Sequence, residues 1–184
     1  TDPGKKADLL HKMSKRYLWY YQDTKAPGSL DTSEMLTYRQ IEFARSINRH
    51  SSLSVAYNNL QGIAWEKGDL RKALIFLDSS FKYTDKENDA IVGTNYFDKA
   101  DIYLELKDYK NATRMADSAL YYRLRENLPA YNAETYELLA RIRRESGDFE
   151  NAYAYREMAR VITDSIRNVD KTKEVAELEK KYSQ

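Results

Sequence analysis

Residues 136–152 read YELLARIRRESGDFENA, and this stretch decides the fold because two earlier stretches share its pattern. Residues 57–73 read YNNLQGIAWEKGDLRKA, and residues 96–112 read YFDKADIYLELKDYKNA. Each stretch starts with a tyrosine, ends 16 positions later with an alanine, and carries a Gly-Asp or Lys-Asp pair before a large apolar residue. Successive alanines are 39 and then 40 residues apart, and self-similarity at such a period indicates a helical repeat.

Each part of the pattern has a role in a hairpin of two helices. The tyrosine lies early in the first helix, where it packs against the second helix. The Gly-Asp or Lys-Asp pair ends the first helix, because glycine accepts a left-handed backbone and aspartate caps the helix that follows. The alanine and another small residue seven positions later lie on one face of the second helix, so the two helices can approach closely. These small residues are Ala73 and Ser80, Ala112 and Ala119, and Ala152 and Ala159.

The pattern resembles the tetratricopeptide repeat, a helix-turn-helix unit, over about residues 53–163. The chain departs from that family in its longer period, near 40 rather than about 34 residues. It also departs at Gln61, where the family has a small residue and the later repeats have Ala100 and Ala140. The proline that usually closes a repeat is missing, except for Pro129 before the third repeat.

We therefore predict an all-α fold, an α-α superhelix of about four helical hairpins plus a C-terminal capping helix, in a single domain of residues 1–184. The first hairpin is irregular. Its first helix is predicted to bury an apolar face, and Asp31 with Glu34 forms a capping box for its second helix. That face consists of Leu9, Leu10, Met13, Tyr17, Tyr20 and Tyr21. The predicted units are 5–50 (the irregular hairpin), 53–87, 92–127 and 131–166 (the three repeats), and 168–182 (the last helix).

Residues 168–182 allow two interpretations. Val175, Leu178 and Tyr182 form an apolar stripe among Glu and Lys residues, as expected of a solvated capping helix that closes the last repeat. The alternative is the entry to a coiled coil, through which the chain forms a homodimer. The segment resembles the one that leads out of the repeats in bacterial sensor kinases and regulators, where a membrane helix and a signalling coiled coil come next.

Composition and motifs argue against a catalytic or metal site and against binding to nucleic acid or membrane surfaces. The formal net charge of +1 lacks the basic excess of a nucleic-acid or membrane-surface binder, and no run approaches the length of a membrane helix. The absence of cysteine removes thiolate metal sites, while His11 and His50 have no partner at metal-ligand spacing. No phosphate loop and no hydrolase motif occurs. We expect no enzyme activity, no metal and no cofactor.

In a solenoid of this type the first helices of the hairpins line a concave groove. Positions one, two, five and eight after each repeat tyrosine are predicted to face it. The candidate binding residues are Asn58, Asn59, Trp65, Phe97, Asp98, Asp101, Glu137, Arg141 and Arg144. For Trp65 and Phe97, packing between repeats is the alternative to ligand contact. Asp98 stands where chaperone-binding members of the family have an amide of their carboxylate clamp, so that clamp is not expected.

The leading hypothesis is a protein- or peptide-binding module, the sensor or interaction region of a larger bacterial signalling or regulatory protein. The alternative is a structural scaffold or dimerisation domain with no ligand in the groove. The compartment is left open between a periplasmic sensor region and the cytoplasm, because a cysteine-free chain suits both.

Overall fold

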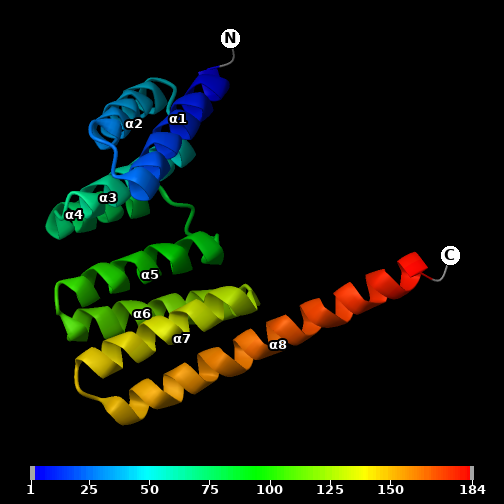
Figure 1. Cartoon of the computed structure of the whole chain (residues 1–184). Coiled ribbons are helices and arrows are strands. Elements are labelled where there is room, and N and C mark those ends of the chain that lie inside the picture. Colours follow the sequence, from blue (N-terminus) through cyan, green and yellow to red (C-terminus); the bar gives the residue numbers. More distant parts are fainter. Residues whose placement is uncertain (1–2, 183–184) are drawn as a thin grey trace.

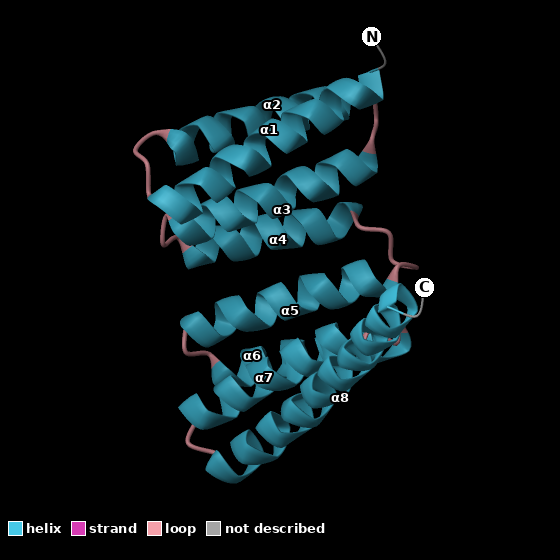
Figure 2. Ribbon diagram, turned by 45° about the vertical axis from the view of Figure 1, so that its right-hand side comes forward, coloured by secondary structure: helices cyan, strands magenta, loops and turns pink. Residues whose placement is uncertain are grey.

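The computed structural model describes residues 3–182, which form eight α-helices joined by short turns. The helices are α1 (Pro3–Thr24), α2 (Ser29–Ser46), α3 (His50–Glu66), α4 (Leu70–Tyr83), α5 (Asp89–Glu105), α6 (Tyr109–Arg125), α7 (Pro129–Glu145) and α8 (Phe149–Tyr182). They pair as four antiparallel hairpins that stack one upon another from α1 and α2 to α7 and α8 (Figures 1 and 2). The predicted all-α fold with a solenoid of hairpins is confirmed.

The repeated pair of residues before each second helix makes the turn that the sequence predicts. Gly68, Lys107 and Gly147 have φ angles of 76°, 60° and 86°, the left-handed conformation that ends a helix. The next residue caps the following helix. The Asp69 carboxylate accepts a hydrogen bond from the Lys72 backbone N–H at 3.0 Å, and Asp108 and Asp148 accept equivalent bonds at 3.1 and 3.3 Å.

The repeat tyrosines pack as predicted, each against a tyrosine of the second helix in its own hairpin. Tyr57 stacks on Tyr83 with ring centroids 5.8 Å apart, and Tyr96 stacks on Tyr122 at 5.6 Å. Tyr136 stacks on a tyrosine of α8 at 6.1 Å. The small residues of the pattern lie at the close contacts between helices and are all buried; they are Ala73, Ser80, Ala112, Ala119, Ala152 and Ala159.

Apolar clusters at the junctions hold successive hairpins together, as in a solenoid where each unit contacts only its neighbours. Leu53, Leu60 and Ile63 of α3 pack with residues of α1 and α2. Leu77 of α4 packs with Ile102 of α5. The third junction has a cluster formed by Ala100, Leu104, Ala112, Ala116, Leu138, Leu139 and Ile142 of α5, α6 and α7.

The first hairpin corrects two predictions. Helix α1 buries Ala7, Ser14 and Leu18, whereas most of the predicted apolar face is exposed. The exposed members are Leu9, Met13, Tyr17 and Tyr20, while Leu10 and Tyr21 are partly buried. The reason is a close crossing of small side chains, in which the Ser14 hydroxyl donates to the Ser33 carbonyl at 3.0 Å and the Ser33 hydroxyl donates to the Ser14 carbonyl at 2.9 Å.

The predicted capping box at the start of the second helix is also wrong. Helix α2 begins at Ser29, after the left-handed Gly28, and Asp31 and Glu34 lie inside it. Their carboxylates instead accept hydrogen bonds from the Lys67 ammonium at 3.0 and 2.6 Å. These bonds attach α2 to the turn of the second hairpin. The helix ends at Ser46, and His50 belongs to α3.

The last repeat and the predicted helix at 168–182 are one element. Helix α8 runs without interruption for 34 residues, about 51 Å at 1.5 Å per residue, so no break separates a capping helix from the repeat. Its C-terminal half projects beyond the stack (Figure 1). The side chains of Val175, Leu178 and Tyr182, on which the predicted stripe rests, lie outside the described part of the structure.

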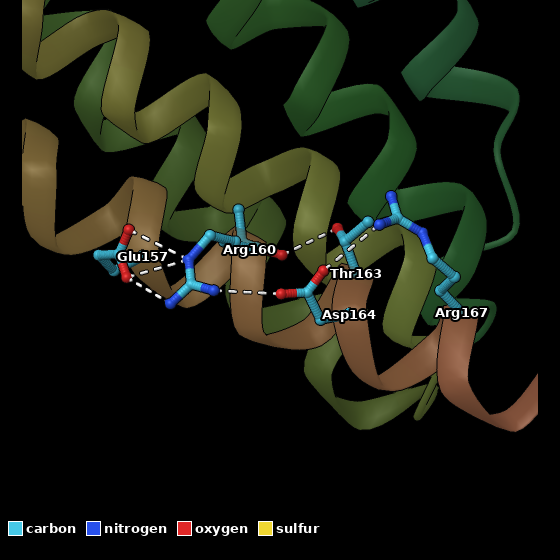
Figure 3. Close-up of polar contacts among 6 residues, drawn as sticks. Glu157, Arg160, Thr163, Asp164 and Arg167 are labelled. Carbon is cyan, nitrogen blue, oxygen red and sulfur yellow. Dashed lines mark hydrogen bonds and ion pairs between the residues drawn. The ribbon is translucent and has the colours of Figure 1, made fainter.

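Charged side chains support α8 where it leaves the stack. The Arg160 guanidinium bridges Glu157 at 2.8 Å and Asp164 at 3.1 Å, and Arg167 lies 3.7 Å from Asp164 (Figure 3). Pairs three and four residues apart stabilise an exposed helix by joining successive turns. Within residues 3–182 no helix combines the length and hydrophobicity needed to cross a bilayer.

Candidate functional site

A polar pocket of about 260 Å³ lies between the first helices α1, α3 and α5. We call it the acidic pocket; it is lined by Gln22, Gln61, Gly62, Trp65, Glu66, Asp98 and Asp101. Three of the predicted groove residues, Trp65, Asp98 and Asp101, meet here because their offsets from the repeat tyrosines, eight, two and five, all belong to the set predicted to face the groove on neighbouring helices.

The three carboxylates of the acidic pocket differ in their partners. Glu66 accepts hydrogen bonds from Lys25 and Gln22, both at 3.0 Å, and these bonds lower its pKa against the opposing effect of burial. Asp101 accepts one from Arg141 at 3.3 Å, although burial still raises its pKa. Asp98 has no hydrogen bond or ion pair with any residue in the described range 3–182.

Burial raises the pKa of Asp98 to about 6, and the negative charge of Asp101 adds to that effect while Arg123 opposes it. The side chain keeps some contact with solvent, but protein atoms surround the carboxyl closely. An acid that is desolvated without a partner destabilises the fold in its charged form. The pocket therefore contains a carboxylate whose charge nothing in the described structure neutralises by direct contact.

Arg123 of α6 is the buried cation behind this pocket. Its side chain is 4% exposed and donates hydrogen bonds to the Tyr131 carbonyl at 3.1 Å and to the Thr135 hydroxyl at 3.0 Å. The guanidinium also lies over the Phe97 ring, 4.2 Å from its centroid. Arg123 thus ties α6 to α5 and α7, and its hydrogen bonds are directed to α7 rather than to Asp98.

A second hollow, of about 400 Å³, lies further along the same side of the stack between α5, α7 and α8. It contains the predicted residues Phe97, Glu137 and Arg141, together with Thr163 and Ile166 of α8. Its lining is mainly apolar, in contrast to the acidic pocket. Arg141 separates the two regions, because its guanidinium pairs with Asp101 and also lies 3.7 Å from Glu105.

The remaining predicted residues lie elsewhere. Asn59 is buried, and its amide is 3.0 Å from His11 Nδ1, so the expectation that it faces the groove is wrong. Asn58 lines a separate hollow beside the α4–α5 connection. Arg144 lies in a hollow at the C-terminal end of the stack. Trp65 packs against the junction of α4 and α5, as the packing alternative predicts, and it also lines the acidic pocket; its contact with a ligand stays a prediction.

Both histidines make contacts with other side chains of the fold. Burial and the nearby Lys15 lower the pKa of His11, whose ring contacts Asn59. The His50 ring packs at 5.6 Å from the Tyr83 ring. Among the described residues, no group of three or more histidine, cysteine or carboxylate side chains is arranged to hold a metal ion.

The spacing of the repeats does not predict Gln22, Gln61 and Glu66, which line the acidic pocket, nor Arg123, whose charge acts on Asp98. A signal existed for Gln61, because it replaces the alanine of the other repeats. Gln22 belongs to the irregular hairpin, and Arg123 lies on a second helix, so offsets counted along the regular first helices could not find them.

The fold and this side of the stack define the chain as a helical-repeat solenoid. No family model matches the chain, and no curated protein matches it. Among solved structures, 18 chains match. One is the crystal structure of BtubC (BKLC) from P. vanneervenii, with a TM-score of 0.73 and 21% sequence identity over 88% of this chain. The match spans 66% of the BtubC chain, and at this identity it shows a shared fold alone.

Proposed function

We propose that the chain is a protein- or peptide-binding module of the tetratricopeptide type, and that the acidic pocket holds a cationic side chain of the partner. The observation that carries the proposal is the unpaired carboxylate of Asp98 in a pocket that also contains Trp65. A lysine or arginine would place its charge beside Asp98 and its aliphatic stem against the indole.

The neighbouring groups support a cation as the ligand. Gln22 and Gln61 supply amide oxygens at the rim, and Glu66 and Asp101 are already paired with Lys25 and Arg141. Within residues 3–182 the Asp98 carboxylate is the one in this pocket without a direct hydrogen bond or ion pair, so a cationic side chain can form a new charge-assisted hydrogen bond with it, about twice as strong as a neutral one. Binding would offset the destabilisation that the isolated charge causes in the free protein.

The test is an array of peptides in which a single position carries Lys, Arg, norleucine or Glu, probed with the purified protein. We expect retention of basic peptides that is lost in Asp98→Asn and Trp65→Ala. Asp170→Asn, on the projecting part of α8, is the control for charge. Retention by Asp98→Asn and Trp65→Ala equal to that of the parent protein contradicts this site, and preference for norleucine or Glu contradicts a cationic ligand.

We also propose the finer setting, that this module is the sensor or interaction region of a larger bacterial signalling or regulatory protein. Its support is the projection of α8 beyond the stack, together with the resemblance of residues 175–182 to the exit segment of such proteins. The coding sequence on both sides of the chain tests it. A membrane helix or an output domain downstream supports the idea, and an unrelated enzyme domain there contradicts it.

The second candidate, a dimerisation domain, is favoured by one observation on α8. Val161 and Val169 are exposed by 59% and 51% along the part that leaves the stack. Light scattering should compare the full chain with one that ends at residue 166. If the full chain and the shortened chain form particles with the same number of copies, dimerisation through α8 is contradicted. A full chain that is a dimer and a shortened chain that is a monomer support it.

A further inference from the structure

The C-terminal end of the stack carries a face that is covered at the equivalent place in the interior hairpins. In the second hairpin, Leu70, Leu74 and Leu77 of α4 lie at the junction where Ile102 of α5 packs. In the third hairpin, Tyr109 and Ala116 of α6 lie in the cluster with α7. The first turns of each second helix therefore form the seat for the first helix of the next hairpin.

In the last hairpin the equivalent residues are Phe149, Tyr153 and Arg156 of α8. Phe149 is 70% exposed and Tyr153 is 68% exposed. They line a hollow of about 350 Å³ with Ala140, Arg141 and Arg144 of α7. We call this surface the end face. Exposed aromatic side chains that line a hollow indicate an interaction surface more strongly than scattered apolar residues do.

The charges of the end face specify what can cover it. The side chains of Arg144 and Arg156 form no hydrogen bond or ion pair within residues 3–182, and Arg156 occupies the position of Leu77 and Ala116 in the interior hairpins. Glu137 is the single carboxylate among the residues that line the hollow. A partner must therefore bring negative charge around an apolar stripe.

The interior of the stack shows how such a partner would sit. Helix α5 occupies the equivalent seat on the second hairpin, and within its 17 residues it carries four carboxylates and one lysine. Between α5 and α7, Asp101 and Glu105 pair with Arg141. An acidic first helix facing an arginine of its neighbour is thus a contact that this chain already makes, and Arg144 is placed to repeat it at the end face.

A second copy of the chain does not bring the negative charge that a partner of the end face requires. The opposite end of the stack exposes Leu9, Met13 and Tyr17 of α1, but Lys5, Lys12 and Arg16 are interleaved with them and are exposed. Stacking two copies head to tail would bring cations against Arg144 and Arg156. Two end faces brought together would do the same, so like charges oppose both arrangements.

We propose that the end face binds an acidic amphipathic helix of a partner protein, which takes the seat that the first helix of a further hairpin would occupy. This surface is separate from the acidic pocket and has the opposite charge. Phe149 and Tyr153 are the apolar anchors, and Arg144 and Arg156 select for carboxylates.

The probe is a fluorescein-labelled peptide of residues 89–105, cross-linked between positions 90 and 94 so that it is helical in isolation. The matched probe carries amides in place of its four carboxylates. Fluorescence anisotropy should show saturable binding of the acidic probe, at least about tenfold weaker binding of the amide probe, and weakening with salt. Absence of saturation at about 1 mM acidic probe overturns the proposal.

Variants locate the site. Phe149→Ser with Tyr153→Ser should weaken binding about 30-fold or more, as for interface anchors, and Arg144→Glu with Arg156→Glu about tenfold or more. All four residues are exposed, so circular dichroism should show an intact fold. Asp98→Asn should leave binding unchanged, which separates this site from the acidic pocket. Full binding by either double variant, or self-association that these variants abolish, overturns the proposal.

Discussion

Asp98→Asn is expected to make the protein more stable at neutral pH. The pKa of Asp98 is about 6 in the folded chain, against 3.8 for the unperturbed group. The unfolded chain therefore loses this proton at lower pH than the folded chain does. Well below pH 3.8 both states are protonated and the residue has no effect, whereas above pH 6 folding must desolvate a charged carboxylate.

The size of the effect follows from the pKa difference. The rise in pKa from 3.8 to about 6 corresponds to about 3 kcal/mol, and partial contact with solvent makes this an upper value. The stability that the wild-type protein has below pH 4 is lost as the pH rises toward 6. Asparagine, which resembles the neutral carboxyl, should keep it. At pH 7.5 the urea midpoint of Asp98→Asn should rise by up to about 1.5 M, for a slope of about 2 kcal/mol per M.

The assay is urea unfolding followed by circular dichroism and by tryptophan fluorescence at pH 4, 5, 6 and 7.5. Agreement between the two signals justifies the use of a single free energy. Asp170→Asn removes the same charge from an exposed site of α8 and should change little. A variant that is less stable than the wild-type protein at pH 7.5 would refute the reasoning, because it would mean that attraction to Arg123 outweighs desolvation.

Three further substitutions test the packing and turn geometry of the stacked hairpins, each by the same urea unfolding measurement. Leu139→Ala should lose about 2–5 kcal/mol, because Leu139 is fully buried in the junction before α7; a loss below 1 kcal/mol would contradict that packing. Lys107→Gly should gain up to about 1 kcal/mol, since Lys107 has a φ of 60° where the other repeats have glycine. Gly93→Ala should lose about 1 kcal/mol net, because its Cβ would lie 2.9 Å from Arg123 Cγ and 3.3 Å from Tyr122 Cβ. A stabilised Gly93→Ala or a destabilised Lys107→Gly would contradict these local geometries.

The repeated parts of the fold could be predicted because their causes are local. A left-handed residue followed by an aspartate fixes each hairpin turn within a few positions, as Gly68 and Asp69 show. The stacking of each repeat tyrosine on the second helix needs only the register of a single hairpin. Nothing in this logic requires knowledge of residues far away in the chain.

The first hairpin shows where that logic fails. Periodicity offers more than one face of α1, and the larger apolar residues lie on the face that stays exposed. The buried face was decided by a close crossing at Ser14, which depends on Ser33 in the next helix. Small polar residues give no hydrophobic signal, so the sequence alone favours the wrong side.

The candidate site, like the fold, was predictable where it depends on the regular repeats and not where it depends on the first hairpin. Trp65, Asp98 and Asp101 meet because the same set of groove-facing positions applies to two regular helices. Asn59 stands at the same offset of two residues as Asp98 but is covered by α1, whose position follows from the irregular hairpin. The pKa of Asp98 depends on burial and on Arg123 from another helix, and neither quantity can be obtained from spacing along the chain.

The ends of the stack pose a problem that every solenoid shares, because an uncovered seat for the next hairpin invites copies to add without limit. Here Lys5, Lys12 and Arg16 at one end and Arg144 and Arg156 at the other give both ends the same sign of charge. Fully polar ends would prevent stacking as well, but they would not retain Phe149 and Tyr153 in the open. On our proposal, the arginines beside Phe149 and Tyr153 disfavour a second copy and favour an acidic helix, so the same charges would limit self-association and select the partner.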